Sequence, residues 1–307
     1  MPLRRTPLLL LSLLSTLFFS LPVLAQSPER PLAESYQGLR SSGVGNSHVA
    51  VASGTDAIYQ NPAGIARAPM YVVDGAFSYT PQGALMSVGI ADSKINPQIA
   101  GGATYNYFYG HSEHSHLSGH DVRVVAAIPA VPERVSIGIG GRYLRITDTT
   151  LPEIDDNPSA QVLLQGFTFD AGIAVRAADM LHLGLVGQNL IDHCRDNSLC
   201  RGTTPTRLTA GLGLGDETLF MISGQASLDL TSSDTPLFDF AAGAEVLAAG
   251  IIPIRAGFER RAFLDRNLLT FGLGWRSEQA GVDFSYRHDL NDLDRFGYIS
   301  GGFSVYF

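Results

Sequence analysis

The sequence predicts an all-β fold: a transmembrane antiparallel β-barrel of about fourteen strands with an amino-terminal plug. Three observations lead to this prediction. From residue 70 onward, apolar residues alternate with polar or small ones, which is the pattern of strands with one apolar face. Tight turns alternate with long polar loops, which is typical of outer-membrane barrels. The chain also stops on a strand that ends in an aromatic residue.

The composition narrows the class of protein. Hydrophobic residues make up 45% of the chain and charged residues 16%, yet beyond residue 25 no unbroken apolar run reaches the roughly 18 residues of a membrane helix. The formal net charge is −8, and it becomes −10 (19 basic against 29 acidic residues) without the two arginines of the first 25 residues. Such an acidic chain argues against nucleic acid as a partner.

Residues 1–25 are predicted to be a secretory signal peptide. Arg4 and Arg5 form a basic start, residues 8–19 form an apolar run, and small residues precede a cleavage site before Gln26. A membrane-anchor helix is the alternative interpretation, but the apolar run is short for it. The mature chain is therefore expected to work outside the cytoplasm, in the bacterial outer membrane.

The barrel is expected to occupy residues 70–307. Phe167, Phe169 and Ala171, for example, share one face, while Thr168 and Asp170 share the other. Alternation alone also fits a soluble β-sandwich, because it does not show which face points outward. The expected strands cover 71–79, 84–91, 99–109, 120–128, 135–146, 166–176, 181–189, 206–214, 217–229, 237–247, 252–260, 267–276, 280–288 and 298–307.

The carboxyl end favours the membrane barrel. Gly302, Val305 and Phe307 lie in a last strand with an apolar outer face, which is ready to pair at an open edge and close the barrel. This ending resembles the assembly signal that the barrel assembly machinery reads during biogenesis. An ordinary strand of a soluble protein is the alternative. The expected surroundings of the closed wall are outer-membrane lipids.

Residues 26–69 do not have the pattern of a membrane strand. A glycine-rich stretch, residues 38–54, precedes Asn61-Pro62-Ala63-Gly64. Residues 56–59 are expected to form one helical turn that ends before Pro62, because the residue before a proline disfavours helix. Gly64 is expected to allow a tight reversal toward the first strand. A periplasmic linker with a chance turn is the alternative to a plug.

The glycine-rich stretch, the Asn61-Pro62-Ala63-Gly64 motif and the carboxyl end together resemble the FadL-like outer-membrane long-chain fatty acid transporters, including their PorV and PorQ-type relatives. The resemblance implies a plug folded inside a fourteen-stranded barrel. It implies passive uptake of hydrophobic, fatty-acid-like small molecules, or alternatively a scaffold that holds secretion proteins at the outer membrane. The resemblance also implies an apolar groove in the outer loops that captures the ligand. The mature chain, 307 − 25 = 282 residues, departs from this pattern, because its long loops at 148–157 and 289–297 are polar.

Two groups of residues suggest local chemistry. Cys194 and Cys200 lie in one polar loop and are expected to form a local disulfide in an oxidising compartment. Four histidines crowd another loop with the spacing of metal ligands, although a solvated loop is the simpler interpretation; they are His111, His114, His116 and His120.

The lumen-facing positions of the expected strands carry charges of both signs, which must pair or stay hydrated. Structural pairing is preferred here over a selectivity ring. There is no His-Glu-x-x-His or Gly-x-Ser-x-Gly motif. The sequence therefore predicts neither an enzyme nor a bound cofactor. The expected lumen-facing charges are Asp74, Arg123, Arg142, Asp170, Arg176, Asp239, Glu245, Arg255, Glu259, Asp283 and Arg287.

Overall fold

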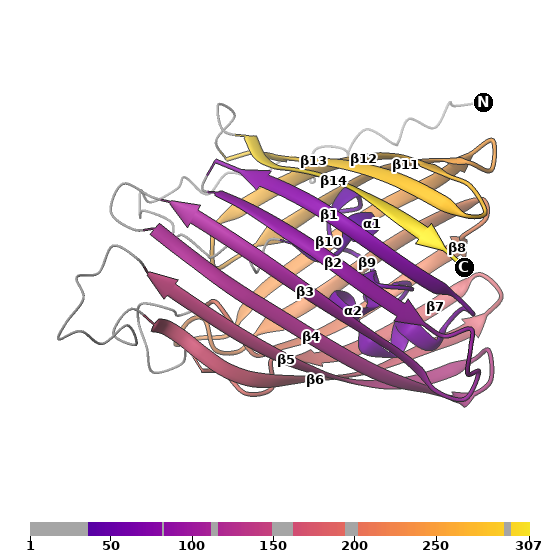
Figure 1. The fold of residues 1–307 in the computed structure, drawn as a ribbon, viewed down its shortest axis with the longest axis horizontal. Helices are drawn as coiled ribbons and strands as arrows, with labels where there is room; N and C mark the ends of the chain where they lie inside the picture. The colour runs from indigo at the N-terminus through magenta and orange to yellow at the C-terminus, as the bar shows by residue number, and fades with distance from the viewer. Residues whose placement is uncertain (1–35, 82, 112–115, 149–161, 194–201, 292–295) are drawn as a thin grey trace, which may run out of the picture.

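A computed structural model describes residues 36–81, 83–111, 116–148, 162–193, 202–291 and 296–307. Fourteen strands form one closed antiparallel barrel, in which each strand pairs with its neighbours along the chain and β1 pairs with β14. Residues 36–70, called the inner segment below, lie within the barrel (Figure 1). The predicted all-β barrel and its strand number are confirmed.

The strands follow the expected ranges with small shifts at their ends. They are β1 Tyr71–Thr80, β2 Gly83–Asp92, β3 Ala100–His111, β4 His116–Val131, β5 Val135–Asp148, β6 Val162–Ala178, β7 Leu181–Gln188, β8 Arg207–Asp216, β9 Phe220–Asp229, β10 Leu237–Ala248, β11 Ile252–Arg261, β12 Arg266–Arg276, β13 Ala280–Asp289 and β14 Phe296–Tyr306.

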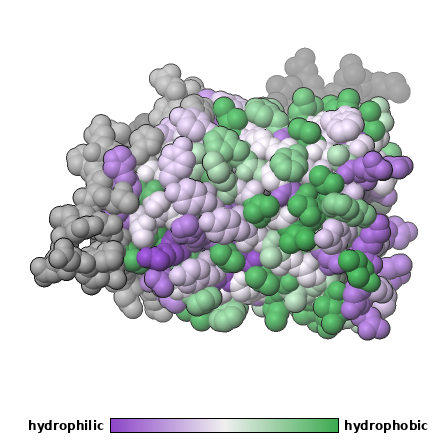
Figure 2. Space-filling view, in the orientation of Figure 1, coloured by the Kyte–Doolittle hydropathy of each residue, from purple (hydrophilic) through white to green (hydrophobic). Residues whose placement is uncertain are grey.

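The apolar face of the strands points outward. Ile139 in β5 is 64% exposed, whereas Arg142 in the same strand is 2% exposed and points into the lumen. In a soluble sandwich the polar face would point outward and the apolar face inward. The burial of these side chains therefore shows which face of the strands is the outer one, which the alternation left open. Figure 2 shows apolar side chains spread over the wall and strongly polar ones mainly toward its two ends. Among the described residues, no helix is long and apolar enough to cross a membrane.

The connections differ between the two ends of the barrel (Figure 1). One end, the turn end, carries the carboxyl terminus and short turns such as 132–134 and 249–251; the other, the loop end, carries the longer loops. The turn expected at Gly215-Asp216 lies further along, because β8 continues to Asp216 and the turn covers residues 217–219. There the Asp216 carboxylate accepts hydrogen bonds from the backbone N–H (2.7 Å) and hydroxyl (2.6 Å) of Thr218, which close the turn.

The inner segment contains three short helices, α1 (Leu39–Gly43), α2 (Asp56–Gln60) and the 3₁₀ helix η2 (Pro62–Ala66). It passes directly over the wall where strands carry glycine. A Cβ on Gly243 of β10 would lie 2.3 Å from the Val44 carbonyl oxygen, and one on Gly257 of β11 would lie 2.3 Å from the Val44 carbonyl carbon. The backbone of the inner segment can therefore approach the sheet only because these positions lack side chains.

This close approach predicts that Gly257→Ala lowers the thermal stability of the folded barrel. The added methyl group has no space, and overpacking of this kind costs about 1–3 kcal/mol. Gly224→Ala in β9 is the matched control, because its Cβ would meet its nearest atom at 3.7 Å. The midpoint of heat-induced loss of the compact form on gels would measure the effect, and equal midpoints for the two variants would contradict the packing argument.

Candidate functional site

The inner segment is held together by a buried carboxylate. The backbone N–H (2.6 Å) and the hydroxyl (2.7 Å) of Ser41 both donate to Asp56 Oδ2, which joins α1 to α2. His48 Nδ1 lies 3.3 Å from the same hydroxyl oxygen. Burial raises the pKa of Asp56, and the Ser41 hydrogen bonds act against this shift. Burial and the charge of Arg40 hold the pKa of His48 well below its usual value.

The motif Asn61-Pro62-Ala63-Gly64 joins the inner segment to β5 and β6. Asn61 Nδ2 donates to the carbonyl oxygens of Val49 (3.0 Å) and Ile173 (3.1 Å), while its Oδ1 accepts from the Ala63 N–H (3.1 Å). The extended Asn61 ends α2, and Pro62 begins η2, as the sequence indicated. The four residues of the motif are buried, and these hydrogen bonds fix it against the wall.

Glycines on the wall make room for this motif. A Cβ on Gly172 of β6 would lie 2.1 Å from Asn61 Oδ1, and one on Gly138 of β5 would lie 2.4 Å from the Ala63 nitrogen. Gly64 has a different role from the one expected. It lies within η2 and is not among the residues with positive φ, whereas a Cβ there would lie 2.4 Å from the Ala52 carbonyl oxygen. Gly64 therefore permits close packing rather than a chain reversal.

On the side facing β8–β13, ion pairs attach the inner segment to the wall. Arg40 of α1 donates to Glu245 of β10 from Nε (3.0 Å) and Nη2 (2.7 Å). Arg255 of β11 pairs with both Glu245 and Asp283. Because each buried charge in this group has a partner of opposite sign, the inner segment completes a neutral network that the strands alone would leave unbalanced.

The turn between β8 and β9 adds a second attachment. Glu217 reaches from this turn to Arg40 (3.5 Å) and to Arg67 (3.2 Å) of the inner segment. Burial alone would raise the pKa of Glu217, but the charges of Arg40 and Arg67 outweigh it and hold the pKa below its usual value. We call the six residues of these two paragraphs the anchor network: Arg40, Arg67, Glu217, Glu245, Arg255 and Asp283.

Some of the other inward charges form ion pairs, as the sequence indicated, whereas Asp74, Asp170 and Asp239 accept hydrogen bonds from Thr55, Asn189 and Ala262. Asp121 lies between Arg123 (3.0 Å) and Arg142 (2.9 Å), and Glu259 accepts from Arg261 (2.7 Å). Arg176 differs from the expectation, because it lies at the turn end with a side chain that is 46% exposed. Asp121 was not among the residues expected in the lumen, although it has the same strand parity as Arg123, and no strand pattern indicates the role of Arg40.

On the opposite side, the inner segment meets the wall through apolar side chains. Ile58, Tyr59 and Ile65 belong to one connected cluster of buried apolar residues that extends over β1–β6 and β14. We call this contact the apolar seam. It reaches from Leu164 in the loop-end half of β6 to Met70 beside the start of β1. Its wall residues are Val72, Ala76, Leu85, Ala91, Ala100, Phe108, Val125, Ala127, Leu144, Ile146, Leu164 and Tyr298.

The four histidines are only partly placed by the structure. His111 ends β3 and pairs in register with His116 at the start of β4, while His114 lies outside the described residues. His120 is exposed, and its Nδ1 lies 2.8 Å from the Tyr105 hydroxyl. Within the described ranges, no group of three or more His, Cys, Asp or Glu residues is arranged to hold a metal ion.

Several other predicted features can be placed or remain untested. Cys194 and Cys200, like the signal peptide at 1–25, lie outside the described residues, so the disulfide and the signal peptide stay predictions.

The predicted assembly signal lies in and just after β14. Val305 pairs with Val73, and the Phe307 N–H donates to the Tyr71 carbonyl (3.0 Å). Gly302 makes room for Leu39 of α1, since a Cβ there would lie 2.6 Å from a Leu39 methyl carbon.

Comparison with known proteins shows a likeness of fold. No protein-family model and no curated protein sequence matches the chain. The CymD monoaromatic hydrocarbon channel matches with a TM-score of 0.64 at 13% identity, over 88% of this chain and 97% of that one. The Ralstonia pickettii toluene transporter TbuX matches with a TM-score of 0.57 at 12% identity, over 92% of this chain and 99% of that one. A Pseudomonas aeruginosa FadL homologue matches with a TM-score of 0.55 at 10% identity, over 88% of this chain and 97% of that one. The expected resemblance to FadL-like barrels is confirmed for the fold, while that to PorV and PorQ stays a prediction.

The anchor network predicts that Glu245→Gln strongly destabilises the protein. The change removes the negative charge that the buried Arg40 and Arg255 share, and breaking a buried pair in this way costs about 3–5 kcal/mol. Glu278→Gln in the exposed turn 277–279 is the matched control. Thermal unfolding of the two purified variants would test this, and an equal midpoint would show that the network does not hold the structure together.

The anchor network also predicts an acid-sensitive attachment. Because the folded state lowers the pKa of Glu217, the attachment contributes stability near neutral pH and loses it as the pH falls below the usual value of 4.5. Limited proteolysis of the inner segment between pH 7 and pH 3, roughly the range over which a carboxyl group titrates, would measure the loss. Glu217→Gln should flatten this dependence, whereas an unchanged acid response in that variant would assign it to another group.

Proposed function

We propose that this chain is a bacterial outer-membrane channel for passive uptake of small hydrophobic molecules, in which residues 26–69 act as a plug. The apolar seam is the observation that carries the proposal. The fold shared with the CymD monoaromatic hydrocarbon channel and the toluene transporter TbuX supports it. In this proposal the apolar wall faces membrane lipid, and the carboxyl end is the signal for the barrel assembly machinery.

The two sides of the plug respond differently to separation. Separating the plug from the wall at the anchor network would leave buried charges without their partners, which costs about 3–5 kcal/mol for each broken pair. Opening the apolar seam to water would cost about 25 cal/mol for each Å² exposed, but a hydrocarbon that fills the gap keeps these surfaces dry. A hydrophobic solute therefore lowers the apolar part of the opening cost on the seam side, where the hydrogen bonds of Asn61 to β6 and of Tyr59 to β2 and β3 must also break, while the anchor network holds.

The charge distribution along the seam bears on the substrate. Arg123 lies over the Tyr59 ring, with its guanidinium carbon 4.8 Å from the ring centroid, but it is already paired with Asp121. An ionised carboxylate entering the seam would therefore lose its hydration without gaining an unpaired cation there. We expect an uncharged hydrocarbon such as toluene to pass more readily than a long-chain fatty acid.

A reversible lock across the plug–wall contact tests the proposal. Thr55 is the residue directly before α2, and a Cβ on Gly89 of β2 would lie 3.1 Å from Thr55 Cγ2, close to the separation of about 3 Å between one Cβ and the partner sulfur in a disulfide. The double change Thr55→Cys and Gly89→Cys would be made in a chain with Cys194 and Cys200 replaced by serine, so that the new pair holds its only thiols.

Uptake of labelled toluene and oleate would be measured in cells that lack their own hydrocarbon channels. We expect toluene uptake above that of empty-vector cells when the lock is reduced, and uptake at the empty-vector level when it is oxidised. The reduced protein is the matched control for the two substitutions. Equal uptake in both redox states would contradict plug movement, and no uptake in either state would contradict the channel and favour the secretion-scaffold alternative.

A further inference from the structure

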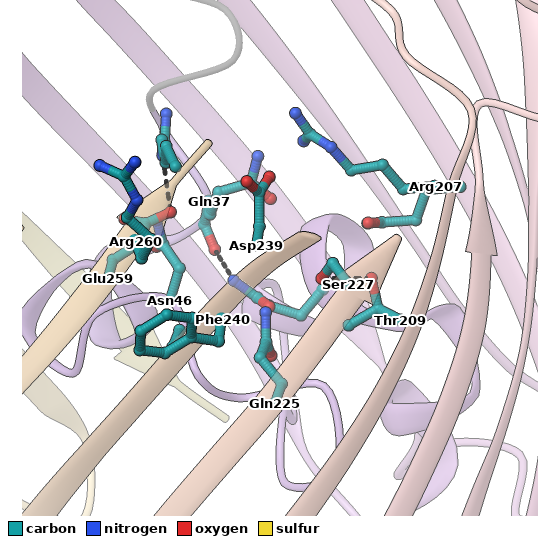
Figure 3. Close-up of a pocket in the computed structure, with 14 residues that line it drawn as sticks. Gln37, Asn46, Arg207, Thr209, Gln225, Ser227, Asp239, Phe240, Glu259 and Arg260 are labelled. Carbon is teal, nitrogen blue, oxygen red and sulfur yellow. Dashed lines mark hydrogen bonds and ion pairs between the residues drawn. The ribbon is translucent and has the colours of Figure 1, made fainter. Parts of the chain in front are cut away.

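A second site lies between the inner segment and the wall on the side away from the apolar seam. It is an open cleft formed near the loop-end halves of β7–β11, with about 510 Å³ of empty space, open solvent included (Figure 3). Its lining is almost entirely polar and includes glutamines from both the inner segment and the strands. Neither the anchor network nor the proposed hydrocarbon route uses this cleft.

Three of the glutamines use only one end of their amide group. Gln225 Oε1 accepts from the Val49 N–H (3.1 Å), Gln60 Nε2 donates to the Gln37 carbonyl (3.4 Å), and Gln188 Nε2 donates to the Tyr59 carbonyl (2.8 Å). The other amide atom of each makes no hydrogen bond to a described residue. These bonds fix the three side chains in place, so the cleft offers one N–H₂ donor and two carbonyl acceptors held ready for a ligand.

The arginines around the cleft are already neutralised. Arg207 pairs with Asp229 (3.6 Å) and Arg260 with Asp265 (2.6 Å). Arg261 pairs with Glu259, whose other oxygen accepts from Asn46 (3.0 Å). Asp239, another carboxylate of the lining, accepts from the Ala262 N–H (2.6 Å). An anion would have to compete with the carboxylates, and a cation with the arginines. The charge arrangement therefore favours an uncharged ligand.

We propose that this cleft binds an uncharged, hydroxyl-rich molecule, namely a free sugar or polyol. Each hydroxyl group of such a molecule both donates and accepts, which matches amide donors and acceptors placed side by side. The barrel wall separates the cleft from the membrane, so the ligand is a water-soluble molecule that enters from the loop end rather than the headgroup of a lipid. A hydrocarbon cannot satisfy the open amide atoms and is excluded from this site.

Binding of glucose to the full purified chain, in a detergent without sugar groups, tests this proposal by saturation-transfer NMR. Gln225→Glu keeps the oxygen that accepts from Val49 and removes the donor that faces the cleft, and Gln188→Met removes one acceptor. Gln98→Met, in the exposed turn 93–99 at the other end of the barrel, is the matched control. We expect saturable binding that weakens about fivefold in each cleft variant, as for one lost neutral hydrogen bond, and is unchanged in the control.

Two outcomes would overturn the proposal: no saturable binding of glucose or glycerol by the unaltered chain, or unchanged affinity in both cleft variants. Thermal unfolding curves would show that each variant is folded. If one variant is unfolded, the titration of the unaltered chain with glucose decides whether the cleft binds a sugar. Toluene should not compete with glucose. Because this assay measures sugar binding on purified protein and the channel assay measures toluene uptake by cells, either proposal can fail without the other.

Discussion

The pairing of buried charges inside the barrel is the constraint on which much of the remaining structure depends. Arg40 shows why, because it comes from the inner segment yet supplies the positive charge that Glu245 of β10 and Glu217 of the β8–β9 turn both contact. Without Arg40, each of these carboxylates would lose one of its two positive partners, because Glu245 also pairs with Arg255 and Glu217 with Arg67. The inner segment is therefore an electrostatic part of the barrel as well as an occupant of it.

This constraint divides the lumen into two sides of different character. The side toward β8–β13 is held by ion pairs and hydrogen bonds, whose strength depends on partner and direction. The side toward β1–β6 is largely held by apolar packing, which depends on area and excludes water without requiring a particular partner. In the proposed channel, the first side resists separation and a hydrophobic solute enters at the second. The polar cleft lies on the side held by ion pairs.

Glycine explains how a folded segment fits into a barrel of this size. Gly138 and Gly172 leave space for the Asn61-Pro62-Ala63-Gly64 motif, and Gly243 and Gly257 leave space for Val44. In each case backbone or a short polar side chain lies where a Cβ would otherwise be. The high glycine content of the strands thus partly records the path of the inner segment across the wall, which is information that strand periodicity does not contain.

The sequence by itself determined the strands, their number and the division of each into an apolar and a polar face, because a period of two between apolar and polar residues follows directly from strand geometry. Only the structure decided that the polar face points into the lumen. The sequence also determined the helix end at Asn61, which depends on the neighbouring proline. Only the tertiary structure decided that Arg40 pairs with Glu245, 205 residues away, that Gly64 serves close packing, and that the apolar and polar contacts lie on opposite sides of the inner segment. These features depend on which strands meet the inner segment in space, and local patterns along the chain do not specify distances between segments so far apart.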